Sequence, residues 1–182
     1  RKMPAFSKSR AVLAGCGMTD CTDTGNIIAE LINHGGYRLI IDADGLNSIK
    51  DRPEILKNAA LPPIITPHIG EMSRLTGAST DAIKSDREKT AAEFSRKYNC
   101  ITVLKDCKTV ISSPEGKLFV CDRPNAGLAK GGSGDVLSGI ISSFAAQGYD
   151  AFDAAVCGAA LHSLAAESAR EKLTEYSMLP SD

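Results

Sequence analysis

A glycine-rich run followed by one carboxylate gives this chain its clearest means of doing chemistry. Four glycines lie within residues 127–134, and Asp135 follows them directly. Residues 136–144 then place apolar side chains on one face at helical spacing, which predicts a helix that begins at Ser133 or Gly134. The backbone N–H groups at such a helix start point to one place and carry partial positive charge. The run therefore predicts an anion site, and a plain glycine turn is the alternative.

Three other polar clusters each follow a short apolar run that predicts a strand. In chain order these clusters are Asp42 with Asp44 and Asn47, His68 with Glu71, and the segment Lys105, Asp106, Cys107, Lys108 and Thr109. Because parallel strands end at one edge of a sheet, we expect these clusters and the glycine run to line one cleft. The plainer interpretations are an Asx-rich turn for the aspartates, a first-turn helix position for Glu71 and a surface position for His68.

The elements that must position these residues alternate between strand and helix patterns. The expected strands lie at 11–15, 39–42, 64–65 and 101–105, and a hairpin is expected around the turn Pro114-Glu115-Gly116. The expected helices are one that ends before Gly35, one over 81–98, one that starts near residue 133 and one over about 151–172. This alternation predicts an α/β fold with a mostly parallel sheet and helices on both faces, in a single domain over residues 1–182.

Composition and charge exclude several classes of function. The net charge is −1 and the pI is about 6.4, and tryptophan is absent. We therefore expect neither a nucleic acid nor an anionic membrane as a partner. No apolar run is long enough to span a membrane, and the first residues do not form a signal peptide. The six cysteines include no C-x-x-C pair, which disfavours a zinc site and is typical of a reduced, cytoplasmic protein.

Three motifs give a more specific indication because they occur in order and at consistent spacing. They are Asp-Ala-Asp-Gly-Leu-Asn at 42–47, Thr-Pro-His-Ile-Gly-Glu-Met at 66–72, and the run from Asn125 to Gly139. Together they resemble the nucleotide-dependent NAD(P)H-hydrate dehydratases of the ribokinase-like superfamily, and the similarity extends from about Ala11 to the tail. That family uses ADP or ATP, with Mg²⁺, to return hydrated NADH and NADPH to the working coenzymes. The resemblance implies phosphorylation of the substrate hydroxyl, followed by elimination of phosphate.

The resemblance also implies a role for each matching residue. Asp135 would accept the proton of the substrate hydroxyl, and Gly132, Ser133 and Gly134 would form an anion hole with their backbone N–H groups. Contacts with the substrate are implied for His68, Gly17, Asp44, Asn47 and Asp135. Contacts with the nucleotide are implied for Lys105, Asp106, Cys107, Lys108, Thr109, Asn125 and Gly134. Glu71 would order Mg²⁺, through water.

The sequence departs from the family pattern at several positions, which include Ile69 and Ala126 in place of prolines and Lys130 before the glycine pair. Asp106 stands where the nucleotide loop of the family usually has glycine. The N-terminal region that family members carry is absent, so we expect residues 1–182 to be a C-terminal part of a longer domain. We also expect a homo-oligomer and an NAD(P)HX epimerase, either fused or separate. Two other functions stay open, namely a kinase for a vitamin precursor or sugar on the same fold, and a non-catalytic nucleotide-binding module.

Overall fold

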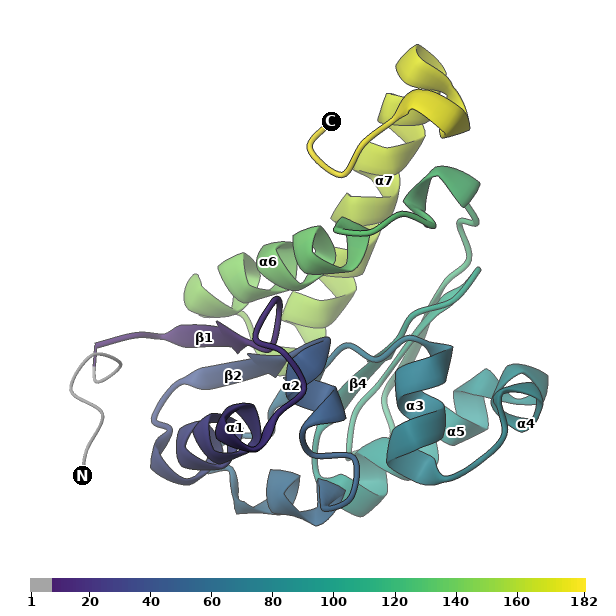
Figure 1. The fold of residues 1–182 in the computed structure, drawn as a ribbon. Helices are drawn as coiled ribbons and strands as arrows, with labels where there is room; N and C mark the ends of the chain where they lie inside the picture. The colour runs from purple at the N-terminus through teal and green to yellow at the C-terminus, as the bar shows by residue number, and fades with distance from the viewer. Residues whose placement is uncertain (1–7) are drawn as a thin grey trace.

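The computed structural model describes residues 8–182, which are built around a six-stranded sheet (Figure 1). The strands follow one another across the sheet in chain order: β1 (Ala11–Ala14), β2 (Arg38–Ile41), β3 (Ile64–Ile65), β4 (Ile101–Leu104), β5 (Thr109–Ser112) and β6 (Leu118–Cys121). Strands β1 to β4 are parallel, β5 is antiparallel to β4, and β6 is antiparallel to β5. The expected strands and the expected hairpin are confirmed.

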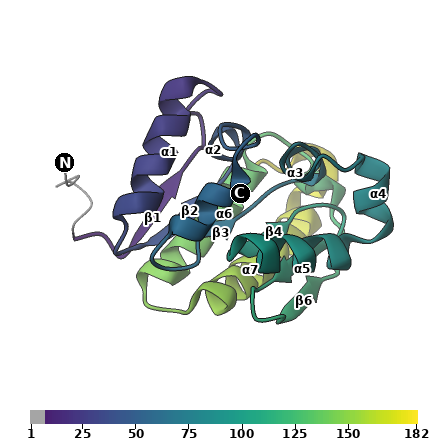
Figure 2. The ribbon, with the colours of Figure 1, turned by 90° about the horizontal axis from the view of Figure 1, so that it is seen from below.

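Helices cover both faces of the sheet, as the sequence predicts (Figures 1 and 2). One face carries α1 (Thr22–His34), the 3-10 helix η2 (Pro53–Asn58), α3 (Ile69–Thr76), α4 (Thr80–Ser85) and α5 (Arg87–Tyr98), and the other carries α6 (Ser133–Ala146) and α7 (Ala151–Ser177). The short helices α2 (Asp44–Asn47) and η3 (Ala126–Leu128) lie in connections. Neighbouring strand residues point to opposite cores, so Ile65 and Ile41 pack under the first set and Ile64 and Ile40 under α6 and α7. None of the helices in the described residues is both long and apolar enough to cross a membrane.

Helices α6 and α7 approach each other closely because α7 carries a glycine at the contact. A Cβ atom on Gly158 would lie 2.5 Å from Ile141 Cγ1 and 3.2 Å from Ile141 Cα. The first distance is far below van der Waals contact and the second is tighter than most such contacts, so a larger residue at this position would push the helices apart.

Two helices differ from their expected extents. The segment 81–98 forms two helices rather than one, because Asp86 leaves the helical conformation with φ −148° and ψ 73°. The Asp86 carboxylate accepts a hydrogen bond of 3.1 Å from Lys89 N and thereby caps α5. The last helix continues to Ser177, beyond its expected end, and is interrupted at Thr174, whose φ is 65°.

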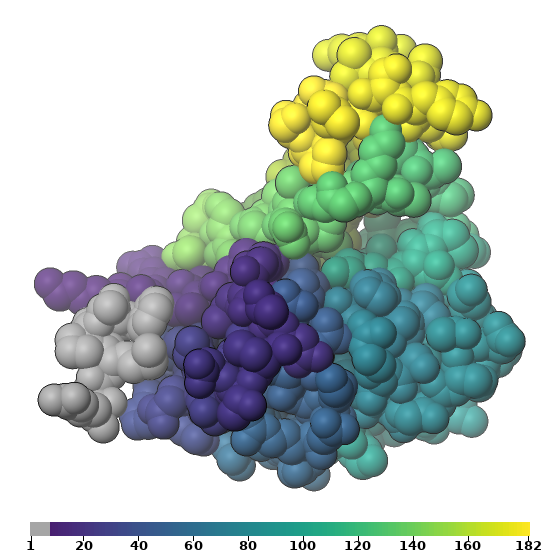
Figure 3. All heavy atoms as spheres, viewed as in Figure 1, coloured from purple at the N-terminus to yellow at the C-terminus, as the bar shows by residue number. Residues whose placement is uncertain are grey.

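After Thr174 the chain turns back onto the glycine run (Figure 3). Met178 is only 3% exposed, and a Cβ atom on Gly127 would overlap its Sδ atom at 2.2 Å. A Cβ atom on Gly132 would lie 3.3 Å from Pro180 Cγ. The end of the described chain therefore packs against both ends of the glycine run.

Lys130, in the middle of the glycine run, holds the end of α7. Its Nζ donates hydrogen bonds to the backbone carbonyls of Glu175 at 3.1 Å, Tyr176 at 2.9 Å and Met178 at 2.5 Å. A cation is favourable at this position because the carbonyl end of a helix carries partial negative charge.

Candidate active site

Four strand ends and the start of α6 meet at one edge of the sheet. Cys16 follows β1, Asp42 follows β2, His68 follows β3 and Lys105 follows β4. The backbones of His68 and Lys105 pair as a parallel bridge. Gly134, in the first turn of α6, is so close to them that a Cβ atom on it would lie 3.1 Å from Lys105 Nζ. The structure therefore brings the glycine run together with the polar residues that end the strands.

The first turn of α6 can bind an anion. Gly132 occupies the N-cap position with φ 95°, a left-handed conformation that favours glycine, and no side chain of residues 8–182 caps the turn. Ser133 N donates a hydrogen bond of 3.3 Å to Lys130 O. The following N–H groups, of Gly134 and Asp135, lie at the positive end of the helix dipole and stay available to a ligand.

A buried carboxylate, Asp42, joins three elements beneath this turn. The side chain is 1% exposed. It accepts hydrogen bonds from Ala43 N at 2.9 Å, Lys105 Nζ at 2.8 Å and Ser138 Oγ at 2.6 Å. Ser138 Oγ also lies 3.1 Å from Thr66 Oγ1 at the end of β3. Because a buried charge is tolerated only when it is paired and hydrogen-bonded, these partners account for the presence of Asp42 in the core.

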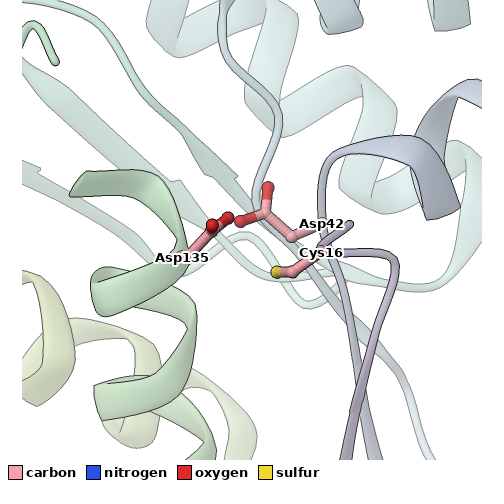
Figure 4. A group of neighbouring side chains, drawn as sticks. All are labelled: Cys16, Asp42 and Asp135. Atoms are coloured by element: carbon pink, nitrogen blue, oxygen red, sulfur yellow. The ribbon is translucent and has the colours of Figure 1, made fainter. Parts of the chain in front are cut away.

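Asp135 and Asp42 point toward a common space, next to Cys16 (Figure 4). The Sγ atom of Cys16 and one carboxylate oxygen from each aspartate all lie within 4.8 Å of one another. Burial, the charge of Asp42 and a hydrogen bond with Asp135 raise the pKa of the Cys16 thiol to about 12. The thiol therefore stays protonated, and Lys105 is the group that offsets the negative charge of Asp42.

His68 and Glu71 form a reciprocal cap at the start of α3. His68 Nδ1 accepts hydrogen bonds from the N–H groups of Gly70 at 2.9 Å and Glu71 at 3.3 Å, and Glu71 Oε2 accepts one from His68 N at 2.8 Å. Burial and the charge of Lys105 lower the pKa of His68, which keeps the ring neutral and Nδ1 free to accept. Burial raises the pKa of Glu71, whose side chain is 6% exposed. Glu71 thus lies in the first turn of α3 and helps to cap it, which is the structural role that the sequence left open.

Two adjoining cavities open at this edge of the sheet. The larger has a volume of about 910 Å³ and reaches His68. The smaller has a volume of about 140 Å³ and lies between the hairpin and α7, where Thr109 and His162 line it. The walls that both cavities share are formed by Lys105, Asp106, Cys107, Asn125, Leu128 and Gly134. Most of the residues that the sequence predicts to contact a nucleotide therefore line one continuous region.

Comparison with known proteins agrees with this geometry. The sequence model of one protein family, described as NAD(P)H-hydrate dehydratase, matches residues 1–182. The chain belongs to this family. The ADP-dependent (S)-NAD(P)H-hydrate dehydratase of Neisseria meningitidis is 37% identical over 164 residues, which cover 88% of this chain and 55% of that protein. The bifunctional NAD(P)H-hydrate repair enzyme of Moorella thermoacetica is 35% identical over 168 residues, which cover 92% of this chain and 32% of that protein.

A solved structure of the dehydratase family has the same fold. The ADP/ATP-dependent NAD(P)H-hydrate dehydratase of Bacillus subtilis, co-crystallised with ATP and Mg²⁺, matches with a TM-score of 0.84 and 27% identity. The match covers 94% of this chain and 60% of that chain. The ribokinase-like fold predicted from the sequence is therefore confirmed. The chain spans between 32% and 55% of the length of the two curated relatives.

Besides Asp135, which lies in the first turn of α6, three predicted substrate positions lie outside the linings of the two cavities. Asp44 Oδ2 accepts a hydrogen bond of 2.9 Å from Thr19 N, and Asn47 Oδ1 accepts one of 2.9 Å from Arg74 Nε. Gly17 has φ 68° and open space beside its Cα atom. These residues shape the loop after β1 and the helix α2, and their contact with substrate stays a prediction.

The predicted nucleotide loop is only partly turned toward the cavities. Lys108 Nζ pairs with Asp122 at 2.6 Å and lies outside both linings, whereas Thr109 lines the smaller cavity. Asp106 Oδ2 accepts a hydrogen bond of 2.7 Å from Arg87 Nε. Arg87 therefore offsets the negative charge that Asp106 adds where the family usually has glycine.

The sequence indicated no specific role for Asp42 in the site, and Ser138 and His162 were not predicted. Ser138 follows Gly134 by four residues, so helical spacing could have placed it on the same face. His162 lines the smaller cavity and makes a hydrogen bond with the Ser133 backbone, while burial lowers its pKa. Nothing local marks His162, because it is a single histidine within an alanine-rich helix.

Proposed function

We propose that this chain carries the site at which ADP or ATP drives the dehydration of hydrated NADH and NADPH. The observation that supports this most directly is the start of α6, whose N–H groups have no side-chain cap among the described residues and lie beside Lys105 and Asp135 at the edge of the larger cavity. Phosphoryl transfer asks a protein mainly for positioning and for stabilisation of charge, which this arrangement offers. The names of the Neisseria and Bacillus relatives support the same activity.

The residues of the first turn divide the chemistry between them. The N–H groups of Gly132 and Gly134 bind the transferred phosphoryl group together with that of Ser133, which exchanges its hydrogen bond to Lys130 O for the anion. Removal of one such donor typically lowers the rate by about two to three powers of ten. The Lys105 ammonium adds positive charge at the same place. Asp135 accepts the proton of the substrate hydroxyl as that oxygen is phosphorylated, and phosphate is then eliminated.

The carboxylates at this edge fit the Mg²⁺ that the proposal requires. Mg²⁺ prefers oxygen ligands and keeps several of its waters, and the exposed carboxylate of Asp135 offers such oxygens, whereas both oxygens of Asp42 are already bonded to Lys105 and Ser138. Glu71 belongs to the same group of charges, because Lys105 and Asp42 both shift its pKa. We assign Glu71 a contact through water, since its side chain is buried and outside both cavity linings. Bound Mg²⁺ would offset the negative charge of the phosphates.

The nucleotide occupies the region where the two cavities join. Its contacts are proposed for Lys105, Asp106, Cys107, Thr109, Asn125 and Gly134, with Lys108 at the outer end of the loop. The hydrated coenzyme lies in the larger cavity, where His68 faces it. We further propose that the complete protein is a cytoplasmic homo-oligomer that acts with an NAD(P)HX epimerase. The bifunctional repair enzyme among the relatives supports a second linked activity.

The test is incubation with hydrated NADH and either ADP or ATP, carried out on this chain and on the complete protein. Return of the absorbance of reduced nicotinamide is the expected result. Formation of ADP from ATP with a vitamin alcohol, and none with the hydrated coenzyme, would identify a small-molecule kinase instead. Binding of both ligands without turnover in the complete protein would identify a non-catalytic module.

Replacement of Asp135 tests the proposed base. Asp135→Asn preserves size, so nucleotide binding should survive while turnover falls by about two to four powers of ten. Asp23→Asn is a matched control, because Asp23 is the exposed first-turn carboxylate of α1. Turnover of Asp135→Asn equal to that of the control would remove Asp135 from the mechanism.

A further inference from the structure

Asp42 lies where it can set the geometry of the phosphate site without touching a ligand. Its side chain is 1% exposed, and it is outside the linings of both cavities. It follows β2 directly, and Gly15, after β1, packs so closely on the backbone of Asp42 that a Cβ atom on Gly15 would lie 1.9 Å from Asp42 O. The two strand ends thus hold the Asp42 backbone firmly beneath α6.

The first contact of Asp42 fixes a cation. Lys105 Nζ donates to Asp42 Oδ1 at 2.8 Å. The Lys105 side chain is 19% exposed and lines both cavities. A lysine carries its charge on a flexible four-carbon chain, so without a partner its ammonium would sample many positions. Asp42 therefore holds this ammonium above the first turn of α6, close to Gly134.

The second contact of Asp42 fixes the helix. Ser138 Oγ donates to Asp42 Oδ2 at 2.6 Å, and Ser138 lies four residues after Gly134 on the same helix. One turn of an α-helix separates these two residues, so the bond sets how α6 is rotated and placed relative to the sheet. Thr66 Oγ1 supports Ser138 from the end of β3 at 3.1 Å.

We propose that Asp42 is the positioning residue of the phosphate site and acts on the bound anion through Lys105 and Ser138. The proposal rests on the proposed function for the identity of that anion, the phosphates of an adenine nucleotide. Two other roles predict different results. A carboxylate that only supported the fold would affect binding whatever residue occupied position 105. A carboxylate that only added negative charge would weaken binding of an anion, and its removal would tighten it.

A double-mutant cycle separates these roles. ADP binding is measured by calorimetry on the wild-type chain, Asp42→Asn, Lys105→Met and the double variant. Asp42→Asn should weaken ADP binding about tenfold, because an ionic hydrogen bond that orients the lysine is lost. In the Lys105→Met background the same change should alter binding by no more than about threefold. Glu30→Gln, a carboxylate-to-amide change on the exposed side of α1, is the control.

The opposite outcomes overturn the proposal. Equal weakening in both backgrounds would assign Asp42 a general structural role, and unchanged or tighter binding would leave it no positioning role. Should Asp42→Asn fail to fold, Ser138→Ala preserves the Asp42–Lys105 pair and should weaken ADP binding about threefold, with recovery in Ser138→Thr. Wild-type affinity in Ser138→Ala would then contradict the proposal. Because binding is measured, a protein that binds ADP without dehydrating the coenzyme refutes the proposed function alone.

Discussion

Individual residues at the edge of the sheet owe their charge states to burial and to one another. Burial and the Lys105 charge keep His68 neutral, and Cys16 holds its proton because its pKa is raised to about 12. Lys105 is consequently the cation proposed to meet an incoming phosphate, and Asp42 is its buried counter-ion. The charges needed for anion binding are therefore arranged before a ligand arrives.

His68 should make the stability of the fold depend on pH. Its pKa in the folded state lies below the ordinary value of 6.5, so between these two values the unfolded chain binds more protons than the folded chain. The free energy of unfolding should therefore fall as the pH drops below about 6.5, until the folded pKa is passed. The buried Glu71, whose pKa is raised above its ordinary value of 4.5, acts in the opposite direction as the pH falls through its folded pKa toward 4.5.

Urea unfolding at several pH values between about 7 and 5 checks this expectation. His68→Asn retains a capping side chain without a titrating ring and should reduce the fall in unfolding free energy. Asn33→Gln, at the exposed end of α1, changes no titrating group and should keep the wild-type dependence. Equal pH dependence in wild type and His68→Asn would exclude the histidine cap as its source.

At the scale of elements, the sequence predicts those strands, turns and helix starts that local residue patterns determine. The strand at 101–104, the hairpin turn at 114–116 and the start of α6 at Ser133 follow from local apolar patterns and turn residues. The break at Asp86 is missed because neither glycine nor proline marks it. The contacts of Asp42 could not be predicted locally, because Lys105 and Ser138 lie 63 and 96 residues away in the sequence.

The contact between α6 and α7 should depend on the absence of a side chain at Gly158. Gly158→Ala places a Cβ atom 2.5 Å from Ile141 and should lower the unfolding free energy by about 1–3 kcal/mol. Gly139 lies in the middle of α6, and no atom of residues 8–182 outside the surrounding helix backbone would lie within 4 Å of a Cβ atom placed on it. Gly139→Ala should therefore raise stability by about 0.5–1 kcal/mol. Denaturant unfolding of both variants measures the difference, and a shift of the same sign in both would contradict the packing described.

Across the whole molecule, the glycine run is held from two sides. The sheet edge holds the start of α6 through Asp42, and the end of α7 holds the run through Lys130 and Met178. The first contact lies within the α/β core, whereas the second involves the part of α7 that projects from it (Figures 1 and 3). Both attachments join segments that are distant in the sequence.

Loss of the second attachment should be measurable as a loss of stability. Lys130→Met removes the ammonium that donates hydrogen bonds to three backbone carbonyls at the end of α7. This change should lower the unfolding free energy by about 1–3 kcal/mol. Lys89→Met, an exposed change on α5, serves as the control and should stay within about 0.5 kcal/mol of wild type. Thermal unfolding measures both, and identical melting temperatures for the two variants would show that Lys130 does not secure α7.

The return of the chain onto its glycine run also has a practical consequence. Pro180 lies against Gly132, the residue that caps α6, so any group attached near position 180 comes to lie beside the turn proposed to bind phosphate. A small environment-sensitive dye placed there would report directly on occupancy of that turn. An affinity tag fused at the same point would crowd it.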